Sequence, residues 1–356
     1  MSYGRKSLVA LLLVMAGCAV TGAPRSEKST YGALFEPPAG RVLHGWGQIS
    51  GYWNWDDPVA KDDARDLDDY DRAVGSDQPA IVSFYVAPVE NQVTGFIKKY
   101  PAFVKARSIP VTQVGIYFMD AFLHKKVAMG EADDELRRIF RTLKESGVPV
   151  LLRVGYEFNS HWNPYDLKLY VTAYRRVTDL ARAEAPGLVA TVWHAEPEGF
   201  ADRDFMEWYP GDEYVDWWGL SLFYPEHMTD TRTGTFMEAA ARHRKPVLIG
   251  ECSPWFRGEK PGTLRGPASL AEAKGWYDGL FRFIEKYPQV KGFNVIVVDW
   301  TRWNTKFSQI PGGLPDVRFD RWPGLDADYR ILIGDKRFIH ATEARVIYGR
   351  KTSSQE

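Results

Sequence analysis

The sequence predicts an α/β fold, and within that class a closed (β/α)8 barrel. Three observations predict this fold. Strand-like runs alternate with helical patterns along the chain, which is typical of a parallel sheet with crossover helices. About eight such runs occur over roughly 250 residues, which matches the size and order of this barrel. No glycine-rich phosphate loop follows the first run, so an open doubly wound sheet is the weaker alternative.

The predicted strands are short and rich in apolar, β-branched and aromatic residues. They span residues 42–48, 80–86, 113–118, 149–154, 188–193, 216–223, 246–251 and 292–298. Helices are predicted at residues 134–146, 165–185, 235–243 and 269–286. The first of these helices is the clearest, because it opens on acidic residues, carries an apolar stripe and is followed by Gly147.

An acidic run follows the first predicted strand. It extends from Asp56 to Asp71 and lacks the ordered spacing of an EF-hand loop. We interpret it as a loop with a solvated acidic face rather than as a calcium site.

The first residues predict an export signal. Arg5 and Lys6 precede a short apolar run at 8–15, which is too short to span a bilayer. Cys18 follows two small residues, and the segment resembles a bacterial lipoprotein signal. Residues 1–17 are therefore predicted to be a lipoprotein signal peptide, with Cys18 lipidated and the protein anchored at the outer membrane or cell surface. An ordinary secretory peptide is the alternative.

The rest of the chain is predicted to form one large domain with two appendages. Residues 18–40 are expected to be a tether, because they are rich in Ser, Thr, Gly, Pro and charge. Residues 41–310 are expected to form the catalytic barrel. Residues 311–356 are expected to be an extension packed on the barrel.

Composition narrows the class of partner. The chain has 45 basic and 46 acidic residues, so it offers no basic field for nucleic acid. Cys252 is the only cysteine besides Cys18, so we expect no intrachain disulfide. We also expect the protein to be a monomer. The histidines show no metal-ligand spacing, so no metal or cofactor is expected. Thirteen Trp, 18 Tyr and 19 Phe favour a carbohydrate partner, although aromatic rings also fill cores.

Two predicted strands end on a glutamate, and these are the candidate catalytic residues. Glu157 follows the fourth strand and Glu251 ends the seventh. A carboxylate is costly to bury unless it is paired, so a glutamate at the tip of an apolar strand needs a reason. Each could simply pair with a neighbouring cation, Arg153 or Lys245. In a barrel, however, both strand ends open onto one mouth, where catalytic residues gather.

Two carboxyl groups at one barrel mouth are what glycoside hydrolysis requires. A retaining enzyme holds them about 5 to 5.5 Å apart, one as acid/base and one as nucleophile, and an inverting enzyme holds them wider. The aromatic neighbours Tyr156, Phe158 and Trp162 disfavour a charged Glu157, which suits the acid. Arg153 and Tyr224 are candidate donors that would keep Glu251 ionised.

Three stretches of the chain resemble glycoside hydrolase family 26, the β-mannanase and β-1,3-xylanase family of barrel glycosidases. They are the segments 153–162, which reads RVGYEFNSHW, 209–219, which reads YPGDEYVDWWG, and 245–251, which reads KPVLIGE. The early segment 45–48, which reads GWGQ, is similar to the first strand of such enzymes. The order of these segments along the chain is more specific than any one of them.

This resemblance implies roles for individual residues. Glu157 would be the acid/base and Glu251 the nucleophile, with Tyr224 hydrogen-bonded to the nucleophile and Trp300 forming the floor of the subsite for the reacting sugar. The predicted substrate-binding residues are Trp46, Gln48, Arg153, Asn159, Trp162, Trp193, Tyr224 and Trp300. Family mannanases usually place His before the acid/base, whereas this chain has Tyr156, so the resemblance implies the reaction more strongly than the sugar.

The predicted function is that of a retaining glycoside hydrolase, endo-acting on a β-linked polysaccharide of the mannan, xylan or glucan type. Two alternatives remain. One is a non-catalytic carbohydrate-binding lipoprotein that keeps the barrel, and the other is a related barrel glycosidase that acts on an exopolysaccharide.

Overall fold

A computed structural model describes residues 29–49, 60–118, 120–163, 165–201, 204–303 and 313–349. The predicted signal peptide and Cys18 lie outside these residues, as does most of the predicted tether. Within the described residues, none of the helices combines the length and the apolar character needed to cross a membrane.

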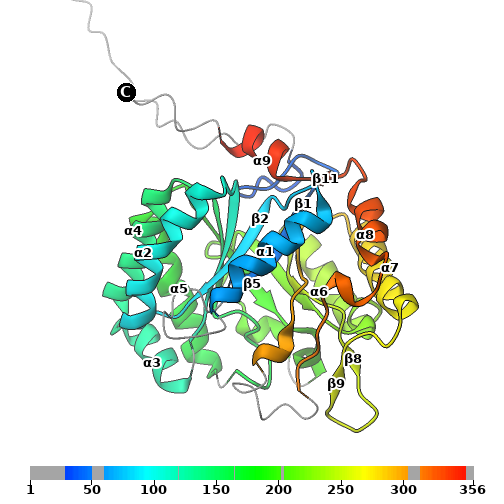
Figure 1. The fold of residues 1–356 in the computed structure, drawn as a ribbon. Coiled ribbons are helices and arrows are strands. Elements are labelled where there is room, and N and C mark those ends of the chain that lie inside the picture. Colours follow the sequence, from blue (N-terminus) through cyan, green and yellow to red (C-terminus); the bar gives the residue numbers. More distant parts are fainter. Residues whose placement is uncertain are drawn as a thin grey trace, which may run out of the picture.

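Eight parallel strands form a closed barrel, so the predicted fold is confirmed (Figure 1). Each strand pairs with its neighbours in chain order, and the last pairs with the first. The strands are β1 (Val42–Ile49), β2 (Ile81–Val86), β3 (Val111–Ile116), β4 (Val150–Val154), β5 (Val189–Ala195), β6 (Trp217–Leu222), β7 (Val247–Cys252) and β10 (Val290–Ile296). All eight overlap the strands predicted from the sequence.

Helices surround the barrel (Figure 1). They are α1 (Ala60–Val74), α2 (Glu90–Ala106), α3 (Ala121–Met129), α4 (Asp133–Ser146), α5 (Leu167–Glu184), α6 (Thr231–Arg242), α7 (Leu270–Lys286), α8 (Leu325–Ile333) and α9 (Ala341–Tyr348). The residues of the acidic run from Asp62 to Asp71 belong to α1, so the prediction of a loop there was wrong. Its apolar residues Leu67 and Tyr70 are buried against the barrel, which gives the segment a helical period.

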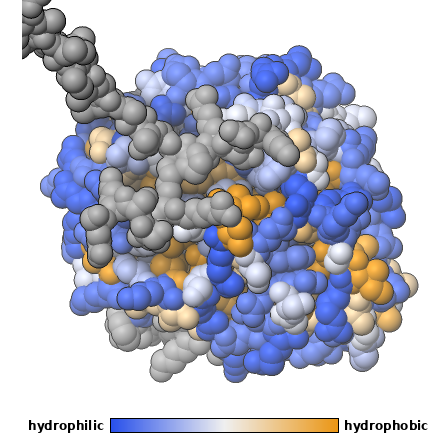
Figure 2. All heavy atoms as spheres, turned by 90° about the horizontal axis from the view of Figure 1, so that it is seen from above, coloured by the Kyte–Doolittle hydropathy of each residue, from blue (hydrophilic) through white to orange (hydrophobic). Residues whose placement is uncertain are grey.

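The amino-terminal end of the barrel is filled with apolar side chains. Leu43, Ile81, Val111, Leu151, Trp217 and Leu248 form one cluster, against which Leu34 and Phe35 pack. The indole Nε1 of Trp217 donates a hydrogen bond to the carbonyl of Leu34 at 2.9 Å. Figure 2 looks onto this end of the molecule, where hydrophilic surface predominates and apolar surface shows in separate patches.

The middle layer of the barrel holds large polar side chains in space left by glycines. A Cβ atom on Gly219 or Gly250 would lie 2.6 or 2.5 Å from the ring of His194. A Cβ atom on Gly45 would lie 1.8 Å from Oδ1 of Asn294. Because a barrel interior is densely packed, these strands need glycine where their neighbours carry a long side chain.

A hydrogen-bonded network crosses this layer and supports β7. Nε2 of Gln113 donates to Oγ of Ser83 at 2.8 Å and to the carbonyl of Gly250 at 3.0 Å. Nδ2 of Asn294 donates to Oε1 of Gln113 at 2.8 Å. The peptide that precedes Glu251 is therefore held from the far side of the barrel.

The carboxyl-terminal segment packs against the barrel through α8, α9 and the short strand β11 (Phe338–Ile339), which pairs with β1. A buried chain of hydrogen bonds fixes it there. His44 on β1 contacts Tyr70 on α1 at 2.6 Å and His340 at 3.0 Å, and Tyr70 contacts Tyr329 on α8 at 2.9 Å. This network ties both ends of the described chain together on the outside of the barrel.

Candidate active site

Two buried glutamates lie at the carboxyl-terminal end of the barrel. Glu157 follows β4 by three residues, and Glu251 is the penultimate residue of β7. Their exposed fractions are 5% and 6%. Burial, and next the negative charge of Glu251, raise the pKa of Glu157 well above its usual range. The carboxyl group of Glu251 is thus close enough to oppose ionisation of Glu157.

A left-handed turn aims Glu157 into the barrel mouth. Gly155 and Glu157 have φ angles of 51° and 53°, in the left-handed region of backbone conformation. This region is sterically unfavourable for Glu157, because its side chain has a Cβ atom. The backbone N–H of Glu157 donates to the carbonyl of His194 at 2.7 Å. Nδ2 of Asn163 donates to the carbonyls of Tyr156 and Glu157 at 3.1 and 2.8 Å. These bonds keep the strained turn in place.

Both oxygens of Glu157 have a polar partner. Oγ of Ser221 lies 2.5 Å from Oε1, and the indole Nε1 of Trp162 donates to Oε2 at 3.2 Å. Ser221 belongs to β6 and is aligned with Glu251 on β7. The ends of β4, β6 and β7 therefore bring the two glutamates and this hydroxyl into one cluster.

Glu251 is paired with a buried arginine. Nη1 of Arg153 donates to Oε1 of Glu251 at 2.7 Å, and the Arg153 side chain is fully buried. The guanidinium also lies over the rings of Tyr85 and Tyr156, 5.1 and 4.4 Å from their centres. A fixed positive charge at hydrogen-bond distance stabilises the carboxylate form of Glu251. The arrangement thus favours a neutral Glu157 and places a buried cation against Glu251.

Aromatic rings line the rim of the mouth. The side chain of Trp162 is 48% exposed, although its indole N–H reaches Glu157. Trp255 stacks on Phe223 with ring centres 4.3 Å apart and meets Trp300 edge to face at 5.4 Å. Trp300 itself is 6% exposed, and its Nε1 is 3.4 Å from Oγ of Ser253. Flat rings of this kind suit the apolar faces of sugars.

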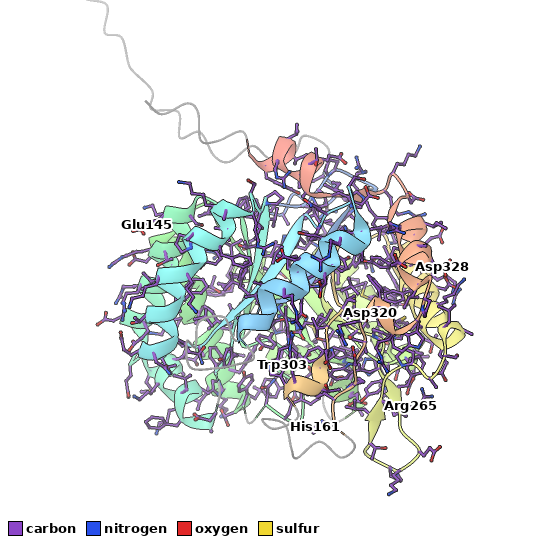
Figure 3. All side chains as sticks on the ribbon, viewed as in Figure 1. Glu145, His161, Arg265, Trp303, Asp320 and Asp328 are labelled. Atoms are coloured by element: carbon purple, nitrogen blue, oxygen red, sulfur yellow. The ribbon has the colours of Figure 1, made fainter. Side chains whose placement is uncertain are left out.

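The labelled side chains show on which side of the molecule this mouth opens. His161 and Trp303 lie toward the bottom of Figure 3, and so does Arg265 of the hairpin formed by β8 (Phe256–Arg257) and β9 (Leu264–Arg265). The α9 helix lies at the top. The candidate site and α9 are therefore at opposite ends of the barrel.

Two tryptophans predicted to contact sugar are packing residues instead. Trp46 is fully buried and faces Tyr70 of α1, with ring centres 6.2 Å apart. Trp193 is fully buried and stacks on Phe158, with ring centres 4.6 Å apart, on the outer face of the barrel. Along a strand, successive side chains point to opposite faces, and these two point toward the helices. A sugar in the mouth cannot reach either ring.

Three other predicted binding residues have different surroundings from those expected. Gln48 is buried at the end of β1. Asn159 uses its side-chain amide on the backbone of Glu196, with both hydrogen bonds at 2.8 Å, so it fixes two loops together. The ring of Tyr224 lies under the Arg257 guanidinium at 4.0 Å and beside His227 at 5.1 Å. The phenols that interact electrostatically with Glu251 are those of Tyr85 and Tyr156.

Sequence reasoning missed several residues of the cluster. Ser221, Tyr85 and Trp255 were not predicted, because Ser and Tyr within a strand carry no motif. A third carboxyl group, that of Glu196, is 1% exposed, and burial raises its pKa to about 7. It accepts hydrogen bonds from the backbone N–H groups of Glu198 and Gly199 at 3.1 and 3.2 Å. Its place directly after β5 was the available signal.

Comparisons with known proteins point to one family of glycoside hydrolases. A family model described as glycosyl hydrolase family 26 matches residues 124–263, which include both Glu157 and Glu251. The β-1,3-xylanase TXYA of a Vibrio species is 28% identical over 81% of this chain and 67% of its own length. Over these residues the chain is similar to glycosyl hydrolase family 26. The predicted resemblance and the predicted class of enzyme, a glycoside hydrolase of a retaining family, are confirmed.

Two further comparisons concern a sequence relative and a solved structure. A β-1,3-xylanase of an Alcaligenes species is 28% identical over 61% of this chain, and the match spans about half (49%) of that enzyme. A modular endo-β-1,4-mannanase from Cellulomonas fimi has a similar fold, with a TM-score of 0.62 at 16% sequence identity. That structural match covers 88% of this chain and 75% of the mannanase. It supports the barrel assignment.

Proposed function

We propose that this protein hydrolyses a β-linked polysaccharide by double displacement, as a member of family 26, with Glu157 as acid/base and Glu251 as nucleophile. The observation that carries the proposal is the asymmetry between the two buried carboxyl groups. Glu251 has the Arg153 guanidinium at 2.7 Å, whereas Glu157 has neutral donors only at its two oxygens. Environments that push two carboxyl groups toward opposite protonation states assign the acid and the nucleophile.

In the first step, the ionised Glu251 attacks the anomeric carbon of the sugar. Glu157 gives its proton to the glycosidic oxygen as the bond to the leaving sugar breaks. The leaving sugar departs as an alcohol, and the remaining sugar is held as an ester on Glu251. Arg153 remains beside Glu251 and orients the carboxylate for the attack.

In the second step, Glu157 is the base. It takes a proton from a water molecule, whose oxygen attacks the anomeric carbon and releases the carboxylate of Glu251. The configuration of the sugar is thereby retained, and Glu157 is protonated again for the next cycle.

We propose β-1,3-xylan as the first substrate to test. The relatives that match the longest stretches of this chain are described as β-1,3-xylanases. The residue before the acid/base is Tyr156, where the family's mannanases usually have His, and its ring packs on Arg153. Mannan and glucan are the next candidates, and an exopolysaccharide remains the alternative in which the same two glutamates act on another polymer. We propose that the enzyme cuts within the polysaccharide chain, because the exposed ring of Trp162 at the rim is open to a long polymer.

The proposal is tested with the variants Glu157→Gln and Glu251→Gln. Each should lower hydrolysis of the polymer by about a factor of 10² to 10⁴, because acid/base catalysis contributes about that much. The matched control is Glu145→Gln, since Glu145 is exposed on α4 and far from the mouth (Figure 3). If the wild-type protein binds one of these polymers without releasing sugar, it is a carbohydrate-binding protein and the proposed reaction is wrong.

We further propose that the protein is exported and held on the cell envelope by a lipid on Cys18, and that it acts as a monomer. The support is the sequence of the first 18 residues, which resembles a lipoprotein signal. The variant Cys18→Ala should move the protein from the membrane fraction to the soluble fraction. Recovery of both forms in the same fraction would favour an ordinary secretory signal.

A further inference from the structure

Ser221 lies between the two glutamates and is fully buried. It is aligned with Glu251 across the β6 and β7 pair, and its Oγ is 2.5 Å from Oε1 of Glu157. Its side chain points into the barrel, as would a Cβ atom on Gly219 two residues earlier, because side chains of a strand alternate in direction. No sequence motif marks this serine, and the reaction described above does not use it.

The donors around Glu157 determine where its proton lies. The indole N–H of Trp162 can only donate, so Oε2 must accept. In a neutral carboxyl group the carbonyl oxygen is the better acceptor, and the acidic proton is therefore on Oε1, beside Ser221. A serine hydroxyl can both accept and donate, so it can bond Oε1 in either protonation state of Glu157.

We propose that Ser221 is the positioning residue for the acid/base, accepting the Oε1 proton of neutral Glu157 and donating to Oε1 once Glu157 is ionised. The inference rests on the proposed function of Glu157. In the first step the Oε1–H bond breaks as the proton passes to the glycosidic oxygen, and the Ser221 O–H rotates toward the new carboxylate. In the second step a proton from water forms the Oε1–H bond again, and the Ser221 hydroxyl returns to accepting.

The Ser221 hydrogen bond affects the two protonation states of Glu157 unequally, because a hydrogen bond to the carboxylate is stronger than one to the neutral acid. Ser221 therefore favours the ionised form of Glu157, against the burial and the carboxylate charges that oppose it. The charged or titratable groups that face Glu157 are Glu251, Glu196, Arg153, Tyr156 and Tyr165. Removing the hydroxyl should leave all of these in place, so its own effect can be measured.

The variants Ser221→Ala and Ser221→Thr test the inference without turnover. The titration of Glu157 is followed by NMR of protein with ¹³C-labelled glutamate side chains, and the Glu157 signal is assigned by its loss in Glu157→Gln. In Ser221→Ala the midpoint should rise by about one pH unit, the difference between a charged and a neutral hydrogen bond. Ser221→Thr keeps the hydroxyl and should restore the wild-type midpoint. An unchanged midpoint in Ser221→Ala overturns the inference.

Kinetics provide the second readout, with xylooligosaccharides and their activated aryl glycosides as probes. The alkaline limb of kcat/KM for the unactivated sugar reports the loss of the Glu157 proton, and it should move up by about one pH unit in Ser221→Ala. The acidic limb of kcat for the activated substrate reports Glu157 in the covalent intermediate, and it should move up equally. A uniform loss of activity with both limbs unmoved would show a merely structural role.

The two proposals fail differently. If the wild type does not hydrolyse any β-linked polymer but the Glu157 midpoint moves in Ser221→Ala, the catalytic assignment is wrong and the Ser221 contact stands. If Glu157→Gln abolishes hydrolysis while Ser221→Ala moves neither the midpoint nor the limbs, the reaction stands and the role of Ser221 is wrong. Thermal unfolding of each variant shows whether it is folded.

Discussion

The guanidinium of Arg153 and the carboxylate of Glu251 form a buried ion pair, with Nη1 2.7 Å from Oε1. The two residues are on β4 and β7, and their side chains cross the barrel interior to meet. Each charge is out of water and depends on the other, because an unpaired buried charge is strongly unfavourable. This pair links the stability of the barrel to the state of the proposed nucleophile.

Replacement of Arg153 by Met should destabilise the protein by about 3 to 5 kcal/mol, since it leaves Glu251 buried without its partner. Hydrolysis should be lost as well. The double variant Arg153→Met with Glu251→Gln should recover much of the stability and none of the activity. Urea unfolding measures the first effect, and equal stabilities of the single and double variants would contradict the coupling.

Replacement of Glu157 by Gln should stabilise the protein near neutral pH while removing activity. Burial raises the pKa of Glu157 in the folded state. A raised folded pKa gives stability that is present below the unfolded pKa, about 4.3, and is lost as the pH rises toward the folded pKa. Gln has no such loss, so the melting temperature of the variant should exceed that of the wild type at pH 7. The difference should shrink near pH 4, and a constant difference would disagree with the raised pKa.

Replacement of Trp162 by Ala should reduce kcat/KM by about 10- to 100-fold, because it removes both a sugar-facing ring and the hydrogen bond to Glu157. Trp162→Phe keeps a ring without the N–H, and its kcat/KM should lie between the values for the wild type and Trp162→Ala. The control is Phe122→Ala on α3, whose exposed fraction of 69% makes it the more accessible ring. The kcat/KM values of the three variants are measured on one polymer. A loss in Phe122→Ala as large as that in Trp162→Ala would show a nonspecific effect.

Replacement of Gly219 by Ala should cost about 1 to 3 kcal/mol of stability, because the new methyl group would overlap His194 and Val192. The matched control is Gly275→Ala in α7, where a Cβ atom meets nothing within 4 Å. That substitution should stabilise the helix by about 0.5 to 1 kcal/mol. Chemical denaturation of both variants tests whether the glycines of the barrel interior are there for space.

The attachment of the carboxyl-terminal segment should weaken in acid. Burial lowers the pKa of His44 and of His340. A lowered folded pKa gives stability that is present above the unfolded pKa, about 6.5, and is lost as the pH falls below it. The wild type should therefore lose unfolding free energy between pH 7 and pH 5. His340→Gln should lose less over this interval, and an equal loss would place the acid sensitivity elsewhere.

The fold and the two glutamates could be predicted because their signals are local. A run of apolar residues predicts a strand wherever the chain goes, and the order of strands in a barrel places the ends of β4 and β7 at one mouth. The contacts of single side chains could not be predicted in this way. Trp46 was predicted to face the sugar and faces Tyr70, because one residue of register reverses the direction of a side chain.

The sequence by itself determined that this chain is a barrel similar to family 26 with Glu157 and Glu251 as its candidate catalytic pair, since these depend on pattern and order. Only the tertiary structure decided which residues surround them. Ser221 and Arg153 reach the glutamates from neighbouring or opposite strands. Such contacts depend on barrel closure and on where glycines leave room, and neither is encoded by any single segment of the chain.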